Sequence, residues 1–263
     1  MAKYKSLGAK VFQAEDEIAG ICSAIGASFA GALACTTTSG PGLSLKTEAL
    51  GLAVMTELPL VVVDVQRGGP STGLPTKSEQ ADLNMALFGR NGEGPCIVIA
   101  ASSPGDCFYQ AYNAAKYAME TMTPCILLTD GNIGQGSELF RIPKVADLPD
   151  IKPPVAKPND PDFKPYRRDP ETYVRQWAIP GMEGLRHRIG GLEKTDIFGA
   201  VSTDPLNHAK MVENRSQKVQ RLANRLPLQT VDGEKEGDLL LVSWGSTKGS
   251  VSTAIKEVRA NGK

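Results

Sequence analysis

The sequence has no net charge, and this absence argues against two classes of partner. Lysine plus arginine and aspartate plus glutamate number 29 each, so the formal net charge is zero. No excess of basic residues indicates binding to nucleic acid or to an anionic membrane. The chain also lacks the run of about 20 apolar residues that a membrane-spanning helix requires. Its start, MAKYKSLGAK, lacks the apolar core of a signal peptide, so we expect a cytoplasmic protein that binds neither nucleic acid nor membrane.

Cysteine is scarce, and its spacing excludes the common metal motifs. The five cysteines include no Cys-x-x-Cys pair, so the sequence holds no usual zinc-ribbon or iron–sulfur motif. Cys96 and Cys125 each lie in a run rich in β-branched and apolar residues. We therefore interpret these two thiols as small buried core residues.

Short apolar runs alternate with helix-like segments over residues 9–131. Runs such as VVVDV and CIVIAA are continuous, as expected for parallel strands covered on both faces. The alternation predicts an α/β fold with a doubly wound, mostly parallel sheet. The expected strands are Ala9–Gln13, Leu33–Thr38, Leu60–Val65, Cys96–Ala101 and Cys125–Thr129, and the expected helices are Glu17–Ala32, Leu43–Met55, Gln80–Phe88 and Pro104–Met122.

The first expected helix is unusually rich in glycine and alanine. Each glycine inside a helix costs about 1 kcal/mol relative to alanine, so several of them need a structural reason. Close packing against a sheet or a neighbouring subunit is the simplest reason. We therefore expect this helix to be buried on most sides.

The composition changes after residue 142, which we take as the end of the first domain, residues 1–142. Residues 143–180 hold nine of the 18 prolines, so we expect an extended Pro-rich arm over residues 143–203. Residues 204–230 form an expected helical connector that starts at Asp204-Pro205. The run DLLLVS, Asp238–Ser243, predicts a strand, and residues 231–263 are expected to be the start of a truncated second α/β domain.

Polar loops follow the expected strands, where open α/β sheets bind ligands. The run TTTSGPG offers hydroxyls and glycines before a helix, which suits an anion or a closely approaching ligand, although the same residues also mark plain turns. The connection over residues 64–82 is long for an α/β fold, and long loops are often functional. Its Arg67 could hold a carboxylate through two hydrogen bonds, or could be an ordinary surface arginine.

Three acidic residues, Glu15, Asp16 and Glu17, stand together before the first expected helix, in the run QAEDE. Acidic residues in a first helical turn complement the helix dipole, which explains all three as caps. The alternative is that one of them does chemistry. Residue type alone favours the cap.

Several motifs occur in order along the chain: QAEDEIA, TSGPGLSL, EALG, TELP, QRGGPSTGLPTKSEQADL, AASSPGDCF, GLRHRIGGLE and MVENRSQKV. Together they resemble the α subunit of the 2-oxoacid:ferredoxin oxidoreductases, with most likeness to the 2-oxoglutarate type. The likeness covers nearly the whole chain. It implies the pyrimidine-type domain of the thiamine diphosphate-binding fold. It also implies oxidative decarboxylation of a 2-oxoacid with coenzyme A, with electrons passed to ferredoxin, or the reverse reaction.

The resemblance further implies a division of labour between subunits. A partner β subunit would hold the diphosphate, Mg²⁺ and the iron–sulfur clusters, and the pairs would assemble into a dimer of heterodimers. Glu17 matches the family glutamate that hydrogen-bonds N1′ of the aminopyrimidine ring and promotes the tautomer that forms the C2 ylid. A dry pocket that raises the pKa of this carboxyl is expected, whereas Glu15 and Asp16 remain expected caps.

The same resemblance implies the other site residues. Arg67 matches the family arginine that holds the substrate carboxylate, and Thr72 and Lys77 are expected to contact the substrate or the partner subunit. The residues implied to line the cofactor near its pyrimidine ring are Thr38, Ser39, Gly40, Pro41 and Gly42.

The chain also departs from the family pattern. Family members precede this region with a strand and a Tyr-Pro-Ile-Thr-Pro-type loop whose threonine contributes to substrate binding, so we expect the first strand of the sheet to be missing here. The activity of this chain alone is therefore in question. An alternative is a catalytically incompetent assembly module that keeps the fold and binds the β subunit. Another is a flavodoxin-like nucleotide binder, which the acids of QAEDE disfavour because they would repel a phosphate at that helix.

Overall fold

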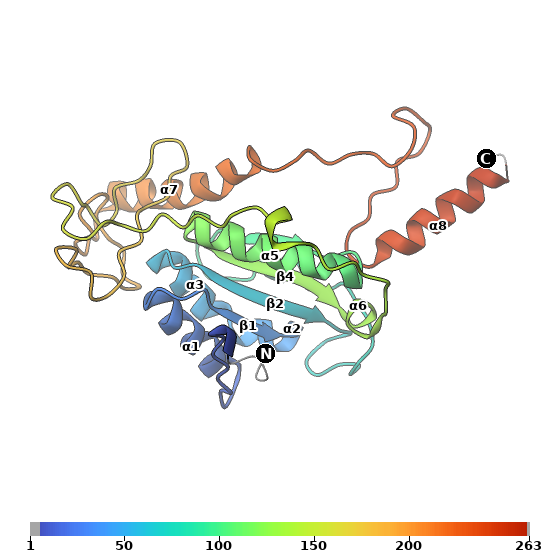
Figure 1. The fold of residues 1–263 in the computed structure, drawn as a ribbon, viewed down its shortest axis with the longest axis horizontal. Coiled ribbons are helices and arrows are strands. Elements are labelled where there is room, and N and C mark those ends of the chain that lie inside the picture. The colour runs from blue at the N-terminus through green and yellow to red at the C-terminus, as the bar shows by residue number, and fades with distance from the viewer. Residues whose placement is uncertain (1–5, 262–263) are drawn as a thin grey trace.

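The computed structural model describes residues 6–261, and a parallel sheet forms its centre (Figure 1). The strands lie in the order β1-β2-β4-β3, and each pairing is parallel. The α/β fold with a mostly parallel sheet is therefore confirmed. The strands are β1 Cys35–Thr38, β2 Leu60–Gln66, β3 Ile97–Ala100 and β4 Pro124–Asp130.

Helices cover both faces of this sheet (Figure 1). Leu60 and Val62 of β2 pack into one core cluster with the helices of the first face, whereas Val61 packs into the cluster of the other face. The alternation follows from the two-residue period of a strand. The first face carries α1 Glu17–Phe29, α2 Gly40–Leu45, α3 Thr47–Thr56 and α4 Leu83–Phe88, and the second carries α5 Pro104–Thr121 and α7 Pro205–Ala223. The other helices are α6 Gly131–Gln135, the 3₁₀ turn Val145–Asp147 and α8 Thr247–Ala260.

Helices α5 and α7 begin where their sequences predict. Ser103 accepts a hydrogen bond from the Asp106 amide, and Pro104 occupies the first turn of α5. Asp204 caps α7 by accepting from two backbone amides, and Pro205 follows it as expected. Proline suits a first turn because the amide that it lacks has no partner within the helix.

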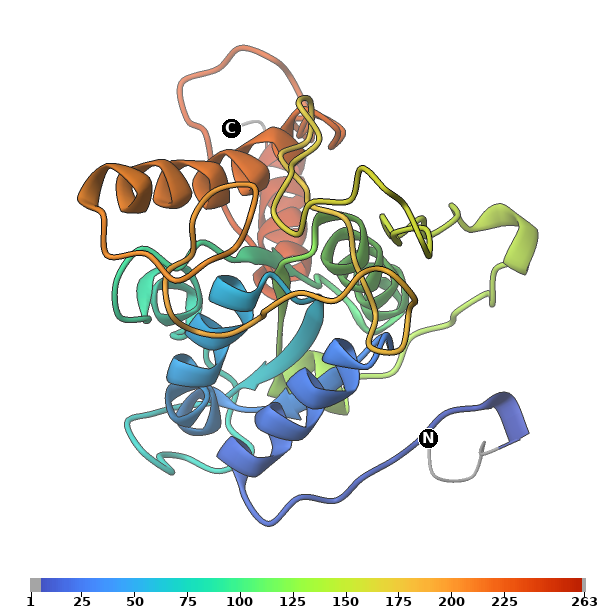
Figure 2. The same ribbon diagram turned by 90° about the vertical axis from the view of Figure 1, so that its left-hand side faces the viewer.

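The expected strand Ala9–Gln13 is wrong for this structure. Residues 9–14 have no regular secondary structure, and Figure 2 shows the segment before α1 leading away from the body of the fold. In the described part of the chain, β1 is an outer strand that pairs only with β2. A strand needs a neighbour to satisfy its backbone groups, and residues 9–13 pair with no described strand.

The expected helix Leu43–Met55 is also corrected, because two helices replace it. Helix α2 starts earlier, at Gly40, and α3 starts at Thr47 after a break at Lys46. Pro41 in the first turn of α2 explains the early start, since its fixed φ angle favours a helix. Helix α4 starts at Leu83, later than the expected Gln80.

The expected strand Asp238–Ser243 is likewise absent. These residues are irregular, and the side chains from Leu239 to Val242 are between 51% and 87% exposed. No described strand lies beside them to pair with. Helix α8 follows with no buried residue, so a second α/β domain over residues 231–263 stays an expectation.

Most of the Pro-rich arm, residues 143–203, is irregular as predicted, yet it is packed onto the fold. Tyr166 is 0% exposed and Trp177 is 1% exposed. Isolated bridges such as Arg168 with Arg175 and Val155 with Trp177 give the arm its local shape. The arm is therefore a folded layer of this chain.

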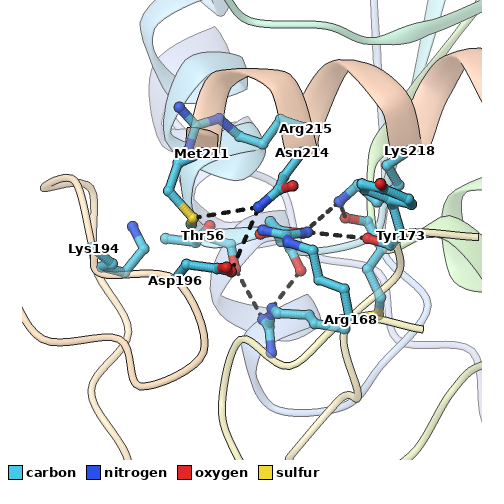
Figure 3. A network of polar contacts seen from close by, with 12 residues as sticks. Thr56, Arg168, Tyr173, Lys194, Asp196, Met211, Asn214, Arg215 and Lys218 are labelled. Atoms are coloured by element: carbon cyan, nitrogen blue, oxygen red, sulfur yellow. Dashed lines mark hydrogen bonds and ion pairs between the residues drawn. The ribbon is translucent and has the colours of Figure 1, made fainter. Parts of the chain in front are cut away.

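A buried ionic network joins the arm, α7 and the end of α3 (Figure 3). Glu57 accepts from both terminal nitrogens of Arg168, at 2.5 and 2.8 Å, and from Lys218 Nζ at 2.7 Å. Arg175 donates to the backbone carbonyls of Thr56 and Glu57. Glu57 is 1% exposed, so one carboxylate links three segments that are far apart in the sequence.

The small-residue helix α1 is less buried than predicted. Its buried residues are Ile21, Ala24, Ile25 and Ser28, which form the sheet-facing side. On the other side Ile18 is 50% exposed and Phe29 is 40% exposed. Burial on most sides is therefore wrong for this chain by itself, because one apolar face of the helix remains open.

Two further expectations concern the cysteines and membrane-spanning helices. Cys96 and Cys125 are both buried, which confirms their interpretation as core residues. Among the described residues, no helix combines the length and the apolar character needed to cross a membrane.

Candidate functional site

The acidic run before α1 places one capping residue and one free carboxylate side by side. Asp16 is the N-cap, and its Oδ1 accepts from the Ala19 amide at 2.7 Å, which confirms its predicted role. Glu17 is the first residue of α1, and its side chain is exposed. Glu15 lies before the cap and is exposed as well.

Glu17, Thr38 and Gly42 meet at the carboxyl end of β1. A Cβ atom added to Gly42 would lie 2.0 Å from Thr38 Oγ1 and 2.8 Å from Glu17 Cγ. The residue is buried, so only glycine fits between the two side chains. The structure thus brings the predicted cofactor loop, Thr38–Gly42, against the predicted catalytic glutamate.

Lys46 is a residue that sequence reasoning missed. Its side chain is buried, and Nζ donates to the backbone carbonyl of Glu17 at 2.7 Å. Burial lowers the pKa of this ammonium group, while the charges of Glu17 and Asp16 oppose the shift. The signal was in the sequence, since Lys46 is the first charged residue after Glu17. Its position fixes the start of α1 relative to α2.

The loop after β2, residues 67–82, is closed on itself by hydrogen bonds. The Gly68 amide donates to the Lys77 carbonyl at 3.0 Å, and the Leu74 amide donates to the Gly68 carbonyl at 2.9 Å. Glu79 Oε2 accepts from the Gly69 amide at 3.0 Å. These bonds give the long loop a defined shape without regular secondary structure.

The three predicted substrate residues differ in placement along this loop. Arg67 is half-buried and directly follows β2, whereas Thr72 and Lys77 are exposed. Thr38 pairs with Asp64 across β1 and β2, so Arg67 leaves the sheet at the same edge as the cofactor loop. Within the described chain, no hydrogen bond or ion pair joins these three residues to Glu17.

Two acids, the buried Asp64 and the half-buried Asp82, also lie at this edge, and neither was predicted as a site residue. Asp64 is 0% exposed, and neither of its carboxyl oxygens has a hydrogen-bond donor in the described structure. Asp82 is the N-cap residue of α4, yet its side chain makes no capping bond. A lone acid inside the β-branched run VVVDV was the available signal for Asp64.

Glu17 is exposed to solvent in the described chain. A cavity of about 550 Å³ lies between Phe29 and the arm around residues 178–189, and it is lined by none of the predicted site residues. The dry pocket that we expected around Glu17 is therefore not formed by this chain alone. The carboxylate stays open on one side.

Comparison with known proteins identifies the family. Residues 1–203 match the family described as "Pyruvate flavodoxin/ferredoxin oxidoreductase, thiamine diP-bdg". This chain belongs to that family. Within this oxidoreductase family, the chain is 55% identical over 263 residues to 2-oxoglutarate oxidoreductase subunit KorA of Mycobacterium tuberculosis. It is 34% identical over 259 residues to 2-oxoglutarate synthase subunit KorA of Methanothermobacter marburgensis.

A solved structure of the same family has the same fold. The structure is 2-oxoglutarate:ferredoxin oxidoreductase from Magnetococcus marinus with 2-oxoglutarate, coenzyme A and succinyl-CoA bound. It matches 99% of this chain with a TM-score of 0.90 and 38% sequence identity. The resemblance to the α subunit of 2-oxoacid:ferredoxin oxidoreductases is thereby confirmed.

The chain is shorter than these relatives. It spans 40% of the Mycobacterium protein and 45% of the solved Magnetococcus chain, although it spans 67% of the Methanothermobacter protein. Within this chain the thiamine diphosphate-binding family match covers residues 1–203.

The residues present fit the aminopyrimidine end of thiamine diphosphate. Glu17 offers a carboxylate with an open side, and Gly42 leaves no side chain between it and Thr38. Gly40 is also tight, because a Cβ there would lie 2.7 Å from both carboxyl oxygens of Asp82. Backbone without side chains allows a flat ring to come close to the loop.

Gly42→Ala is expected to lower the free energy of unfolding by about 1–3 kcal/mol, because the added methyl group overpacks the contact between Thr38 and Glu17. Chemical denaturation followed by circular dichroism measures the change. Gly26→Ala is the matched control, since a Cβ at Gly26 meets nothing within 4 Å and alanine favours a helix. Equal stability of the two variants would contradict the tight packing at Gly42.

Proposed function

We propose that this chain is the α-subunit part of a thiamine diphosphate-dependent 2-oxoacid:ferredoxin oxidoreductase. The enzyme would oxidatively decarboxylate a 2-oxoacid, with 2-oxoglutarate as the preferred candidate, to its acyl-CoA and pass the electrons to ferredoxin. The observation that carries the proposal is the open Glu17 carboxylate against the glycine-lined cofactor loop. The named substrates of the relatives support the choice of 2-oxoglutarate.

Thiamine diphosphate, when bound, supplies the nucleophilic carbon and the electron sink that decarboxylation requires. Glu17 would hold a proton at N1′ of the pyrimidine ring, and Lys46 would keep the first turn of α1 in place through the Glu17 carbonyl. Thr38, Ser39, Gly40, Pro41 and Gly42 would border the ring.

Arg67 would hold the substrate carboxylate. Its Nε is buried and has no acceptor among the described residues, so part of the guanidinium group is still available for a ligand. A guanidinium group can bind a carboxylate through two parallel hydrogen bonds. Thr72 and Lys77, exposed further along the loop, would contact the substrate or the partner subunit.

A β subunit would complete the site. The open side of Glu17 and the exposed apolar face of α1, with Ile18 and Phe29, are consistent with a partner that covers this region. We propose that the partner holds the diphosphate, Mg²⁺ and the iron–sulfur clusters, in a dimer of heterodimers located in the cytoplasm. Ferredoxin and coenzyme A would bind through the complex.

Reconstitution tests the proposal. The chain is mixed with a matching β subunit, thiamine diphosphate, Mg²⁺ and coenzyme A, and reduction of a one-electron dye is followed with a panel of 2-oxoacids. We expect dye reduction that depends on the 2-oxoacid and is fastest with 2-oxoglutarate. A stable complex without activity on any 2-oxoacid would contradict the proposed oxidoreductase activity.

That negative result would favour the second candidate, an assembly module that binds the β subunit without catalysis. The observation behind this candidate is the edge of β1, which has no strand beside it in the described residues, together with the irregular segment 9–14. Both lie next to the start of α1. The two candidates therefore differ in activity and agree in complex formation.

A further inference from the structure

Asp64, which is buried, and Asp82, which is half-buried, lie near the start of α2, where each acts on the titration of the other. A hydrogen bond between the two carboxyl groups contributes to the pKa of each. Both oxygens of Asp64 and Oδ2 of Asp82 are buried without a hydrogen-bond donor in the described structure. The carboxylate of Asp82 also lies against Gly40, where a Cβ would approach both of its oxygens to 2.7 Å.

Among the described residues, no positive charge contributes to the pKa shift of either acid, so none compensates two ionised carboxylates. The register neighbours of Asp64 are Thr38 in β1 and Leu128 in β4, and neither carries a charge. The other charged group that acts on Asp82 is a further acid, Glu79, which raises its pKa. Two adjacent carboxylates without a cation repel each other strongly, so one of them keeps its proton.

We propose that Asp64 and Asp82 share one proton, and that this hydrogen bond closes the base of the loop 67–82. Asp64 lies near the end of β2 just before the loop, and Asp82 lies at its last residue. Gln66 makes a second hydrogen bond across the base of the loop, because its Oε1 accepts from the Asp82 amide at 3.1 Å. The pair therefore acts as a set of positioning residues for the loop that carries Arg67.

Asp64, 0% exposed, is more deeply buried than the half-buried Asp82, so Asp64 is the member that keeps the proton. Burial, and then the charge of Asp82, raise the pKa of Asp64 to about 8. The hydrogen bond from Asp64 lowers the pKa of Asp82, although burial raises it more. Because Asp64 in the folded chain binds its proton up to about pH 8, the closing bond is present below that pH and is lost above it.

The inference rests on the proposed function only in its consequence for substrate binding. The pairing itself can be measured on the purified chain without cofactor, substrate or partner. Its failure would leave the proposed oxidoreductase untouched, and failure of the oxidoreductase would leave the pairing intact.

Trypsin cleavage of the loop after Lys77 gives the readout, because this residue is exposed within the closed loop. The initial rate, divided by the rate on a free peptide of residues 72–82, is measured between pH 6.5 and 9.5. For the unmodified chain we expect the ratio to rise by about tenfold, with a midpoint near pH 8, as the shared proton is lost.

Substitutions separate a shared proton from a general effect of pH. Asp64→Asn should keep the ratio low and flat across this pH range, because its amide donates to Asp82 at every pH. Asp82→Asn should also be flat, since its amide donates to Asp64. Asp64→Leu, which removes the bond but keeps the site apolar, should raise the ratio at every pH.

Asp204→Asn is the matched control, because asparagine caps α7 as well as aspartate does and the residue is remote in sequence from the pair. It should keep the profile of the unmodified chain. A flat profile in the unmodified chain would overturn the proposal. So would a midpoint near pH 8 that persists in both asparagine variants, or full protection of the loop in Asp64→Leu.

Discussion

Glu17→Gln will lower 2-oxoacid-dependent dye reduction by the assembled complex at least about 100-fold and leave the fold unchanged. Glutamine has nearly the same size as glutamate but cannot take up and return a proton at N1′. The exposed side chain makes no hydrogen bond within the described chain that the substitution would break. Exchange of the C2 proton of bound thiamine diphosphate, followed by NMR, measures the step directly and should be abolished.

The neighbouring acids supply controls for this result. Glu15→Gln changes an exposed charge two residues earlier, and Asp16→Asn keeps a capping side chain for α1. Both should retain activity within about threefold, because neither carboxylate has a predicted catalytic role. Normal C2 exchange in Glu17→Gln would show that another group serves the cofactor. A loss of exchange in Glu15→Gln instead would assign the role to Glu15 and contradict its assignment to Glu17.

Much of the fold could be predicted from local sequence patterns. Continuous apolar runs place β2 and β4 to within one residue at each end, and Ser103-Pro104 and Asp204-Pro205 mark the starts of α5 and α7. Two expected strands, Ala9–Gln13 and Asp238–Ser243, do not form. Both have the residue types of strands, but a strand forms only beside a partner, and its partner is a non-local property that local pattern does not contain.

The site was predicted less completely than the fold. The family motifs place Glu17 and the loop Thr38–Gly42, and the structure brings these residues into contact. Lys46 and Asp64 were not predicted because their roles depend on burial, which their residue types argue against. A single charge within an apolar run can be either a surface residue or a buried polar group, and only its three-dimensional partners distinguish the two.

In the ionic network around Glu57, burial again determines what a charged side chain does. Glu57 is 1% exposed, and its carboxylate accepts from Arg168 of the arm and Lys218 of α7. Arg175 of the arm donates to the backbone carbonyls of Thr56 and Glu57. Burial by itself would raise the pKa of Glu57, but the charges of Arg168 and Lys218 outweigh it and hold the pKa well below its usual value. Glu57 is therefore ionised at neutral pH and compensates the cations around it.

This pKa shift predicts the behaviour of the network in acid. The folded pKa of Glu57 lies below that of the unfolded chain, so the unfolded chain binds the proton first. The stability that the carboxylate contributes is present above about pH 4.5 and is lost as the pH falls towards the folded pKa. The pKa of Glu193 is also lowered, so its contribution to stability is likewise lost in acid. Burial would raise its pKa, but hydrogen bonds from Arg215 and other groups lower it to about 2.

Glu57→Gln is accordingly expected to lower the free energy of unfolding by about 3–5 kcal/mol, the usual cost of removing one partner from a buried ion pair. Glutamine fills the same space but leaves Arg168 and Lys218 buried without a counter-charge. Chemical denaturation followed by the fluorescence of Trp177, which is 1% exposed in the arm, measures the change.

The control is Glu48→Gln at the exposed start of the same helix, α3, where a surface charge contributes less than about 1 kcal/mol. If Glu57→Gln were as stable as Glu48→Gln, the arm and α7 would have to be held by apolar packing alone. The acid-dependent loss of stability between about pH 4.5 and the folded pKa of Glu57 should also be smaller in Glu57→Gln, because the group that titrates there has been removed.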